Sequence, residues 1–139
     1  MKLGDIMSTP VVTVEADDRL DSLRELFNET GYHHLLVVSA GKLRGIISRR
    51  DLSAALSPKL GTPAELPEDA ATLNRRAHQI MHREVIYLNA SDEVLSAVKA
   101  FNKHPISCLP IVDEQQQPLG MVSWRDIMRQ AELKLFNGD

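Results

Sequence analysis

The feature that most constrains this chain is an internal repeat, because its first half returns with changes in its second half. The offset is 74 residues between Ile6 and Ile80 but 75 between Asp51 and Asp126. One residue has therefore been added, and the loops SAGK and DEQQQ, each between two apolar runs, tolerate it most easily. The matched segments are Ile6-Met7 with Ile80-Met81, VVTV (11–14) with VIYL (85–88), Phe27-Asn28 with Phe101-Asn102, and GIISRRDL (45–52) with GMVSWRDI (120–127).

Each copy carries the same order of secondary-structure signals. VVTV and VIYL are short β-branched runs that predict strands. An amphipathic helix follows, because apolar residues recur at three-to-four spacing until near Gly31 in one copy and Pro105 in the other. Its predicted starts are Asp17-Asp18 and residues 91–93, whose side chains suit free backbone N–H groups.

The second part of each copy predicts a hairpin and a helix. LLVVS with LRGIIS, and LPIVD with LGMVS, are nearly continuous apolar runs around a turn, typical of buried strands. A second helix is predicted from Arg49 to about Ser57, and from Trp124 to about Phe136.

The resulting unit is β-α-β-β-α, and about 50 residues bury too little surface to be comfortably stable alone. We therefore predict an α/β protein of the α+β type, with two tandem repeats packed through their sheets in pseudo-two-fold symmetry. The predicted boundaries are 1–56 for the first repeat, 57–76 for a connector of loop plus helix from Glu68, and 77–139 for the second repeat.

Composition excludes several classes of function. A formal net charge of -3 and a pI near 5.9 lack the basic footprint of a nucleic-acid binder. No apolar run approaches the roughly 18 residues that span a bilayer, and the start lacks a signal-peptide core, so we expect a cytoplasmic protein without membrane contact. The single cysteine, Cys108, excludes an intrachain disulfide and is predicted to be buried within ISCLPIV.

The repeated S-x-x-D motif, Ser48 with Asp51 and Ser123 with Asp126, admits two interpretations. As a capping box it satisfies backbone N–H groups at a helix start and stabilises each helix by about 1 kcal/mol, and a single such match favours this explanation. Alternatively, the carboxylate accepts hydrogen bonds from the vicinal hydroxyls of a ribose.

Two further features suit a nucleotide. Gly45 and Gly120 lie inside apolar strands, where glycine often indicates that another group approaches the backbone closely. Arg49, Arg50 and Arg125 follow the strands at the helix starts and would suit phosphate, although charged residues there are as often a solvated face.

The tandem copies, the openings DIMSTPVVTV and QIMHREVIYL, the strand CLPIVD and the doubled G-h-h-S-x-x-D-h together resemble a pair of CBS domains. Such a pair is called a Bateman module, and the resemblance covers about residues 1–56 and 77–135. It implies that ribose is held by Asp51 with Ser48 and by Asp126 with Ser123. It also implies that the base lies in the cleft between the copies, held by main-chain groups. These are Val11, Val12, Tyr32 and His33 opposite Asp126, and Val85, Ile86, Ile106 and Ser107 opposite Asp51.

The resemblance further implies two unequal clefts. Some nucleotide-binding members carry a phosphate-contacting basic pair where this chain has His33-His34, whereas the second copy has Ser107-Cys108. We therefore favour the cleft with Asp126, Ser123, His33 and His34. The first copy reads HHLLVVS where the family usually has a proline before and an aspartate after its two valines, a form that Pro110 and Asp113 keep.

The resemblance implies a non-catalytic regulatory module that binds an adenosine-containing ligand of the AMP, ADP or ATP type and serves energy sensing. Binding is expected to change the angle between the halves or between protomers and to signal in trans to an effector protein. A homodimer is expected through helices, with Trp124, Ile127, Met128 and Leu133 as apolar contacts.

Three alternatives stay open. The chain is a degenerate CBS pair that acts as a dimerising scaffold without ligand, or a sensor of S-adenosylmethionine or of a metal ion. For the metal, His78 and His82 stand four apart on a predicted helix, yet an exposed helix face explains them better than a site. No nucleophile, base and orienting group can be assembled into a catalytic site, so no catalytic residue is predicted.

Overall fold

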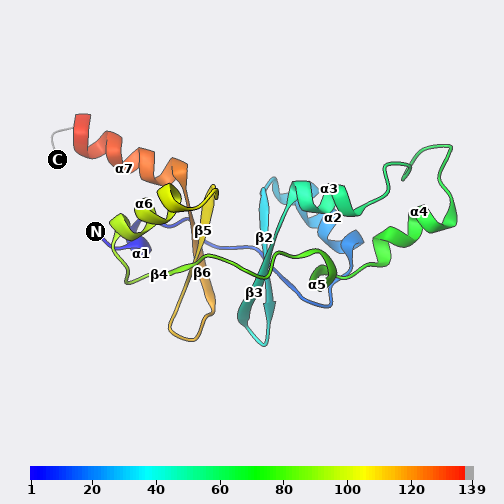
Figure 1. Ribbon diagram of the computed structural model, residues 1–139, viewed down its shortest axis with the longest axis horizontal. Helices are drawn as coiled ribbons and strands as arrows, with labels where there is room; N and C mark the ends of the chain where they lie inside the picture. The colour runs from blue at the N-terminus through cyan, green and yellow to red at the C-terminus, as the bar shows by residue number, and fades with distance from the viewer. Residues whose placement is uncertain (137–139) are drawn as a thin grey trace. The chain divides into compact units, whose positions relative to one another are not determined.

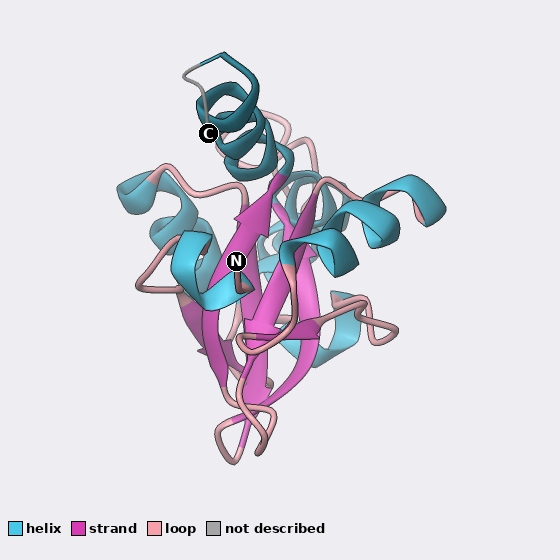
Figure 2. Cartoon of the chain, turned by 90° about the vertical axis from the view of Figure 1, so that its left-hand side faces the viewer, coloured by secondary structure: helices cyan, strands magenta, loops and turns pink. Residues whose placement is uncertain are grey.

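The computed structural model describes residues 1–136, and it divides into two compact units. Unit 1 comprises Met1–Val11 and Ile86–Asp139, and unit 2 comprises Val12–Val85. Each unit holds one three-stranded sheet flanked by helices, so the predicted fold class of two β-α-β-β-α repeats is confirmed (Figure 2).

Unit 2 contains the first sheet and the connector (Figure 1). Strand β2 is central, with β1 parallel to it and β3 antiparallel. Its elements are β1 (Thr13–Glu15), α2 (Leu20–Thr30), β2 (His34–Ser39), β3 (Lys42–Ser48), α3 (Arg49–Ala55), α4 (Pro67–Ala71), the 3-10 helix η1 (Thr72–Asn74) and α5 (Ala77–Ile80).

Unit 1 repeats this topology with β5 at its centre, β4 parallel and β6 antiparallel. Helix α7, at the red end of Figure 1, is longer than its counterpart α3. The elements are α1 (Leu3–Ile6), β4 (Leu88–Asn89), α6 (Val94–Lys103), β5 (Cys108–Val112), β6 (Pro118–Ser123) and α7 (Trp124–Phe136).

Each unit has its own apolar core between helices and sheet. The predicted three-to-four spacing on α2 places Leu20, Leu23 and Phe27 on one face, and all three are buried against the sheet residues Leu35 and Ile47. In unit 1, the core residues are Leu3, Ala97, Phe101, Leu109, Ile111 and Val122.

The two sequence copies exchange their opening segments. Helix α1 belongs to the first copy by sequence, yet it packs in unit 1, where Leu3 is fully buried and its N–H donates to the Asp92 carbonyl at 2.8 Å. Helix α5 of the second copy packs in unit 2, where Ala77 N–H donates to the Asp18 carbonyl, also at 2.8 Å. These four-residue helices were not predicted, because a single turn carries no readable periodicity.

The exchange explains the two strand glycines. The residue after each opening helix pairs with the third strand of the sheet, Ser8 with Met121 and His82 with Ile46. A β-carbon built on Gly45 would lie 2.5 Å from the Met81 sulfur, and one on Gly120 would lie 2.7 Å from that of Met7. The close approach predicted from these glycines is therefore present, and the approaching group is the chain itself.

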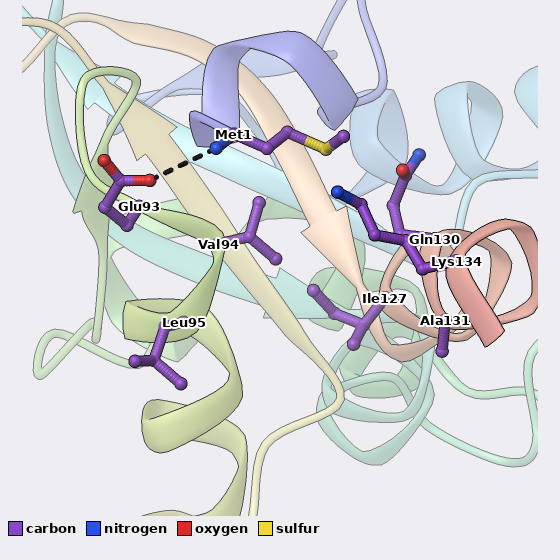
Figure 3. A pocket seen from close by; sticks show the side chains of 8 residues that line it. All are labelled: Met1, Glu93, Val94, Leu95, Ile127, Gln130, Ala131 and Lys134. Atoms are coloured by element: carbon purple, nitrogen blue, oxygen red, sulfur yellow. Dashed lines mark hydrogen bonds and ion pairs between the residues drawn. The ribbon is translucent and has the colours of Figure 1, made fainter. Parts of the chain in front are cut away.

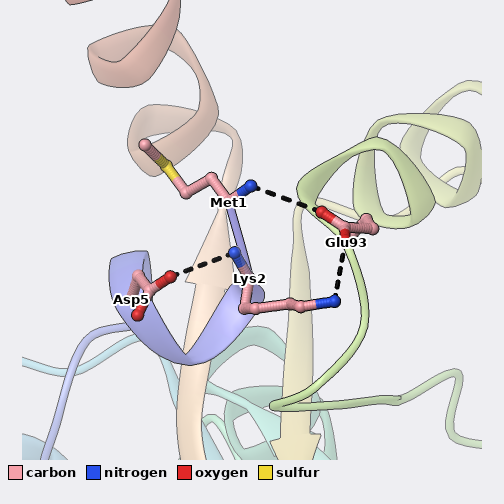
Figure 4. Close-up of polar contacts among 4 residues, drawn as sticks. All are labelled: Met1, Lys2, Asp5 and Glu93. Atoms are coloured by element: carbon pink, nitrogen blue, oxygen red, sulfur yellow. Dashed lines mark hydrogen bonds and ion pairs between the residues drawn. The ribbon is translucent and has the colours of Figure 1, made fainter.

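An ion pair joins the exchanged helix α1 to unit 1. Lys2 Nζ lies 2.7 Å from Glu93 Oε1, and the Met1 amino group lies 3.3 Å from Glu93 Oε2 (Figures 3 and 4). The corresponding bridge in unit 2 joins Arg19 to Arg76. The main-chain pairing is thus common to both units, whereas the ion pair at this bridge is present only in unit 1 and, being exposed, contributes little.

Several details differ from the predicted elements. Asp18 and Asp92 do not cap α2 and α6, because their carboxylates accept from the backbone N–H groups of Glu15 and Asn89 and close the preceding turns. Strands β1 and β4 cover only the end of the predicted runs, and α3 ends at Ala55 rather than Ser57. Cys108 is only half-buried, although that burial raises the pKa of its thiol to about 11.

We predict that Gly45→Ala and Gly120→Ala each destabilise the protein by about 1–3 kcal/mol, the usual cost of an overpacked site. The new methyl group would overlap a methionine side chain and approach a main-chain oxygen to about 3 Å. Urea unfolding measures the loss, with Arg44→Ala on the exposed side of β3 as the control. Glycine variants as stable as this control would show that the segments do not pack this tightly.

Candidate functional site

The first S-x-x-D motif lies in unit 2, where β3 passes directly into α3. Ser48 is the N-cap residue, and its hydroxyl oxygen accepts from the Asp51 N–H at 3.0 Å. In return, Asp51 Oδ2 accepts from the Ser48 N–H at 2.8 Å. Both bonds of the predicted capping box are therefore present.

The second motif, between β6 and α7 in unit 1, is bonded differently. Asp126 Oδ2 accepts from the Ser123 N–H at 2.8 Å, as in the first copy. The Ser123 hydroxyl, however, donates to the same carboxylate oxygen at 3.2 Å. The side chain of Asp126 is 7% exposed, compared with 24% for Asp51. The same sequence motif thus holds its two carboxylates unequally.

The second oxygen of each carboxylate faces a side chain that the sequence analysis did not assign to the site. Asp51 Oδ1 lies 3.0 Å from His82 Nε2, and Asp126 Oδ1 accepts from Arg129 Nη1 at 3.4 Å. Arg129 stands three residues after Asp126 on α7, a spacing that sequence could have indicated. No local signal indicates His82, because it reaches Asp51 through the exchanged segment.

The surroundings of Asp51 have opposing effects on its pKa. Burial by itself raises the pKa, but hydrogen bonds from Ser48 and from His82 outweigh it, so the pKa is lowered. The folded state therefore favours the ionised carboxylate, which accepts hydrogen bonds and does not act as an acid.

His34 lies beside this carboxylate, at the start of β2 and directly across from Ser48 on β3. Burial and then the neighbouring His33 lower the pKa of His34, while Asp51 acts in the opposite direction. The structure thus brings His34, Ser48, Asp51 and His82 together within unit 2. His33 is exposed.

The predicted phosphate arginines separate into two kinds. Arg49 is engaged, since its Nε donates to the Tyr32 carbonyl at 2.7 Å, its Nη2 donates to the Phe27 carbonyl, and its guanidinium lies 5.1 Å from the Phe27 ring centre. Arg50 and Arg125 are exposed.

Trp124 takes the place of Arg49 in unit 1. Its indole N–H donates to the Ile106 carbonyl at 3.2 Å, and its ring lies 6.2 Å from that of Phe101. In both copies the first residue of the helix therefore ties that helix to the turn before the central strand.

The predicted base-contacting residues are divided between the units. Val12, Tyr32 and Val85 belong to unit 2, and Val11, Ile86, Ile106 and Ser107 belong to unit 1. Tyr32 and Ser107 are exposed, and the five apolar residues are half-buried. The favoured combination of Asp126 with His33 and His34 draws on both units and stays a prediction.

Residues 1–136 contain no cluster of three or more His, Cys, Asp or Glu side chains suited to a metal ion. His78 lies on α5 and His82 after its end, so the two do not share a helix face as predicted. Within the same range, no helix combines the length and the apolar character required to cross a bilayer.

The chain is similar to proteins of one family. A sequence profile of the CBS domain matches residues 3–58 and again 77–132. A homoserine O-acetyltransferase of Methanococcoides burtonii is 28% identical over 128 residues, which is 91% of this chain but 23% of that protein. The homologous enzyme of Methanosarcina acetivorans is 29% identical over 126 residues, 90% of this chain and 21% of the relative. The chain therefore spans less than a quarter of these relatives.

Two solved structures share the fold over most of this chain. The CBS domain pair of protein MJ0100, in complex with 5-methylthioadenosine and S-adenosyl-L-methionine, is 26% identical, with a TM-score of 0.75 and coverage of 96% of this chain and 98% of that one. The cytosolic domain of the Mg²⁺ channel MgtE, in complex with ATP, is 20% identical, with a TM-score of 0.75 over 93% of this chain and 48% of that one. The second likeness concerns the fold alone.

We predict that Asp51→Ala lowers the free energy of unfolding by about 1 kcal/mol at pH 7, the usual effect of a lost cap. Because the pKa of Asp51 is lower in the folded than in the unfolded state, the carboxylate stabilises the fold above its unfolded pKa of about 4. This contribution is lost as the pH falls through the folded value. Urea unfolding at pH 7 and pH 3 should therefore show the difference from wild type shrinking in acid, and an equal difference at both values would contradict it.

Proposed function

The chain belongs to the CBS domain family as a tandem pair of repeats, and from this premise we propose that it is a regulatory module for an adenosine-containing ligand. The ligand is of the AMP, ADP or ATP type, and the module signals in trans to a partner protein. The observation that carries the proposal is the duplicated carboxylate, Asp51 and Asp126, held ionised-side outward from a helix start by the same backbone bond in both copies.

The carboxylates retain capacity for a ligand. A carboxylate offers about four lone-pair sites, and the backbone N–H of the serine occupies one of them in each copy. His82 and Arg129 engage the second oxygen, but their side chains are 66% and 60% exposed. Exposed ion pairs contribute about 0–1 kcal/mol, so the vicinal hydroxyls of a ribose can replace either partner at small cost.

The similarity to the CBS pair of MJ0100 supports the adenosine part of the proposal. That protein holds 5-methylthioadenosine and S-adenosyl-L-methionine, which share a nucleoside with AMP and ATP. A ribose-binding carboxylate recognises the shared part of these molecules, so S-adenosylmethionine stays an alternative ligand. His33, His34, Arg50 and Arg125 are proposed to favour a phosphate over the uncharged tail of a thioether.

A catalytic role is not part of the proposal. The thiol of Cys108 has its pKa raised to about 11 by burial, so at neutral pH it is protonated and a poor nucleophile. The lowered pKa of Asp51 likewise favours an acceptor of hydrogen bonds over a proton donor.

A second candidate is a dimerising scaffold that binds no ligand. It is favoured by the closed capping box of Ser48 and Asp51, which is fully bonded by the chain itself. The exposed apolar side chains of Trp124, Met128 and Leu133 would then supply the dimer contact, with Ile127 half-buried behind them.

Thermal unfolding with AMP, ADP, ATP, 5-methylthioadenosine and S-adenosylmethionine tests the proposal. A ligand at one hundred times its Kd stabilises the native state by about 2.7 kcal/mol, which raises the melting temperature by several degrees. Guanosine monophosphate serves as the control for the base. If no adenosine compound raises the melting temperature, the sensor proposal fails and the scaffold is favoured.

We predict that Asp126→Ala weakens nucleotide binding more than Asp51→Ala, because the favoured site combines Asp126 with the basic His33-His34 pair. Calorimetry below both unfolding transitions measures the two affinities, and melting curves account for the lost caps. A larger loss from Asp51→Ala would instead follow the exposure of the two carboxylates and place the site at Asp51.

A further inference from the structure

Unit 1 has an open apolar hollow between the start of α6 and one side of α7 (Figure 3). Its volume is about 500 Å³. Figure 3 shows the side chains of α6 on one side and those of α7 on the other. The residues used below are Glu93, Val94, Leu95, Ile127, Ala131 and Lys134, and we call this surface the α6–α7 hollow.

The internal repeat identifies the matching surface in unit 2. With the offset of 74, Val94 and Leu95 correspond to Leu20 and Asp21 at the start of α2. With the offset of 75, Ile127 corresponds to Leu52 on α3, and Lys134 corresponds to Lys59 just beyond it. The comparison therefore asks what covers this surface in unit 2.

The connector covers it. The 3-10 helix η1 packs against α2, and the Leu20 N–H donates to the Arg75 carbonyl at 2.9 Å. On the other side, Ser57 Oγ donates to Asp69 Oδ1 at 2.7 Å, and Ser57 N–H donates to Thr72 Oγ1 at 3.3 Å. The helical segment 67–74 is thus tied to both walls of the matching surface.

Burial differs between the two surfaces as a cover would require. Leu20 and Leu52 are 0% and 5% exposed, whereas their counterparts Val94 and Ile127 are only half-buried. Beside them, unit 2 has the polar Asp21, whereas unit 1 has Leu95 at 59% exposed. Unit 1 therefore presents more apolar surface and lacks a matching connector among its described residues.

Charge indicates the chemistry of a fitting segment. The hydrogen bond from Ser57, then that from the Leu66 backbone, and the charge of Lys59 lower the pKa of Asp69 in the connector. Lys134 is the counterpart of Lys59 and lines the hollow. A segment with a carboxylate in its first helical turn would meet a cation in unit 1 as the connector does in unit 2.

We propose that the α6–α7 hollow docks a short helical segment of a partner protein, with an acidic residue followed four positions later by a leucine. The connector is the template, since Asp69 and the half-buried Leu73 have this spacing. The connector of a second copy is not free to serve, because Asp69 and Thr72 are bonded to Ser57 of their own unit. The occupant is therefore another polypeptide.

The test uses the full chain and a fluorescein-labelled peptide of the connector sequence, ELPEDAATLNRR (65–76). Fluorescence anisotropy should show saturable binding below about 1 mM. Leu95→Glu should weaken it by about tenfold or more, the loss expected for one buried leucine contact. Leu135→Glu, on the exposed side of α7 outside the hollow, is the matched control and should leave the affinity unchanged.

A charge reversal separates docking from loss of fold. Lys134→Glu should weaken the native peptide, and a peptide with Asp69→Lys should recover binding to this variant. Absence of saturable binding, or equal binding by the Leu95→Glu variant, overturns the proposal. A Leu95→Glu variant that halves the mass in sedimentation also overturns it, because the surface then belongs to a second copy. The measurement contains no nucleotide, so its outcome is independent of ligand binding.

Discussion

The main-chain pairing of each opening segment with the third strand of the sheet is the interaction on which both units depend. Ser8 pairs with Met121, and His82 pairs with Ile46, in two-way hydrogen bonds of 2.8–3.1 Å. Each pairing brings in a helix from the other sequence copy, which contributes Leu3 to one core and Ala77 to the other. Neither sequence-defined repeat therefore contains a complete unit, and the tandem arrangement is required by packing as well as by size.

The same exchange separates what the sequence predicts from what it does not. The hairpins and the helices α2, α6 and α7 follow from local periodicity, and the glycines correctly indicate a close approach. The partner in that approach is not predictable, because Met7 and Gly120 are far apart in the sequence and no periodic pattern links them. His82 is missed at the candidate site for this reason, since it reaches Asp51 only as part of an exchanged segment.

The two copies of the motif therefore differ through residues outside it. Arg129 is charged at any ordinary pH, so its bond to Asp126 does not depend on protonation. The pair of His82 and Asp51 is an ion pair only when the imidazole is protonated. Two carboxylates with the same local sequence thus respond differently to pH, and any ligand that they bind would share this difference.

Capping and ligand binding place compatible demands on the same side chain. The helix requires one oxygen, Oδ2, which accepts the serine N–H in both copies, while the other oxygen faces an exposed basic side chain. A ribose that displaces His82 or Arg129 leaves the helix start bonded as before. The fold is consequently stable without ligand, and the exposed base holds the place of the sugar hydroxyls. A carboxylate whose two oxygens were both needed by the helix would allow no such replacement.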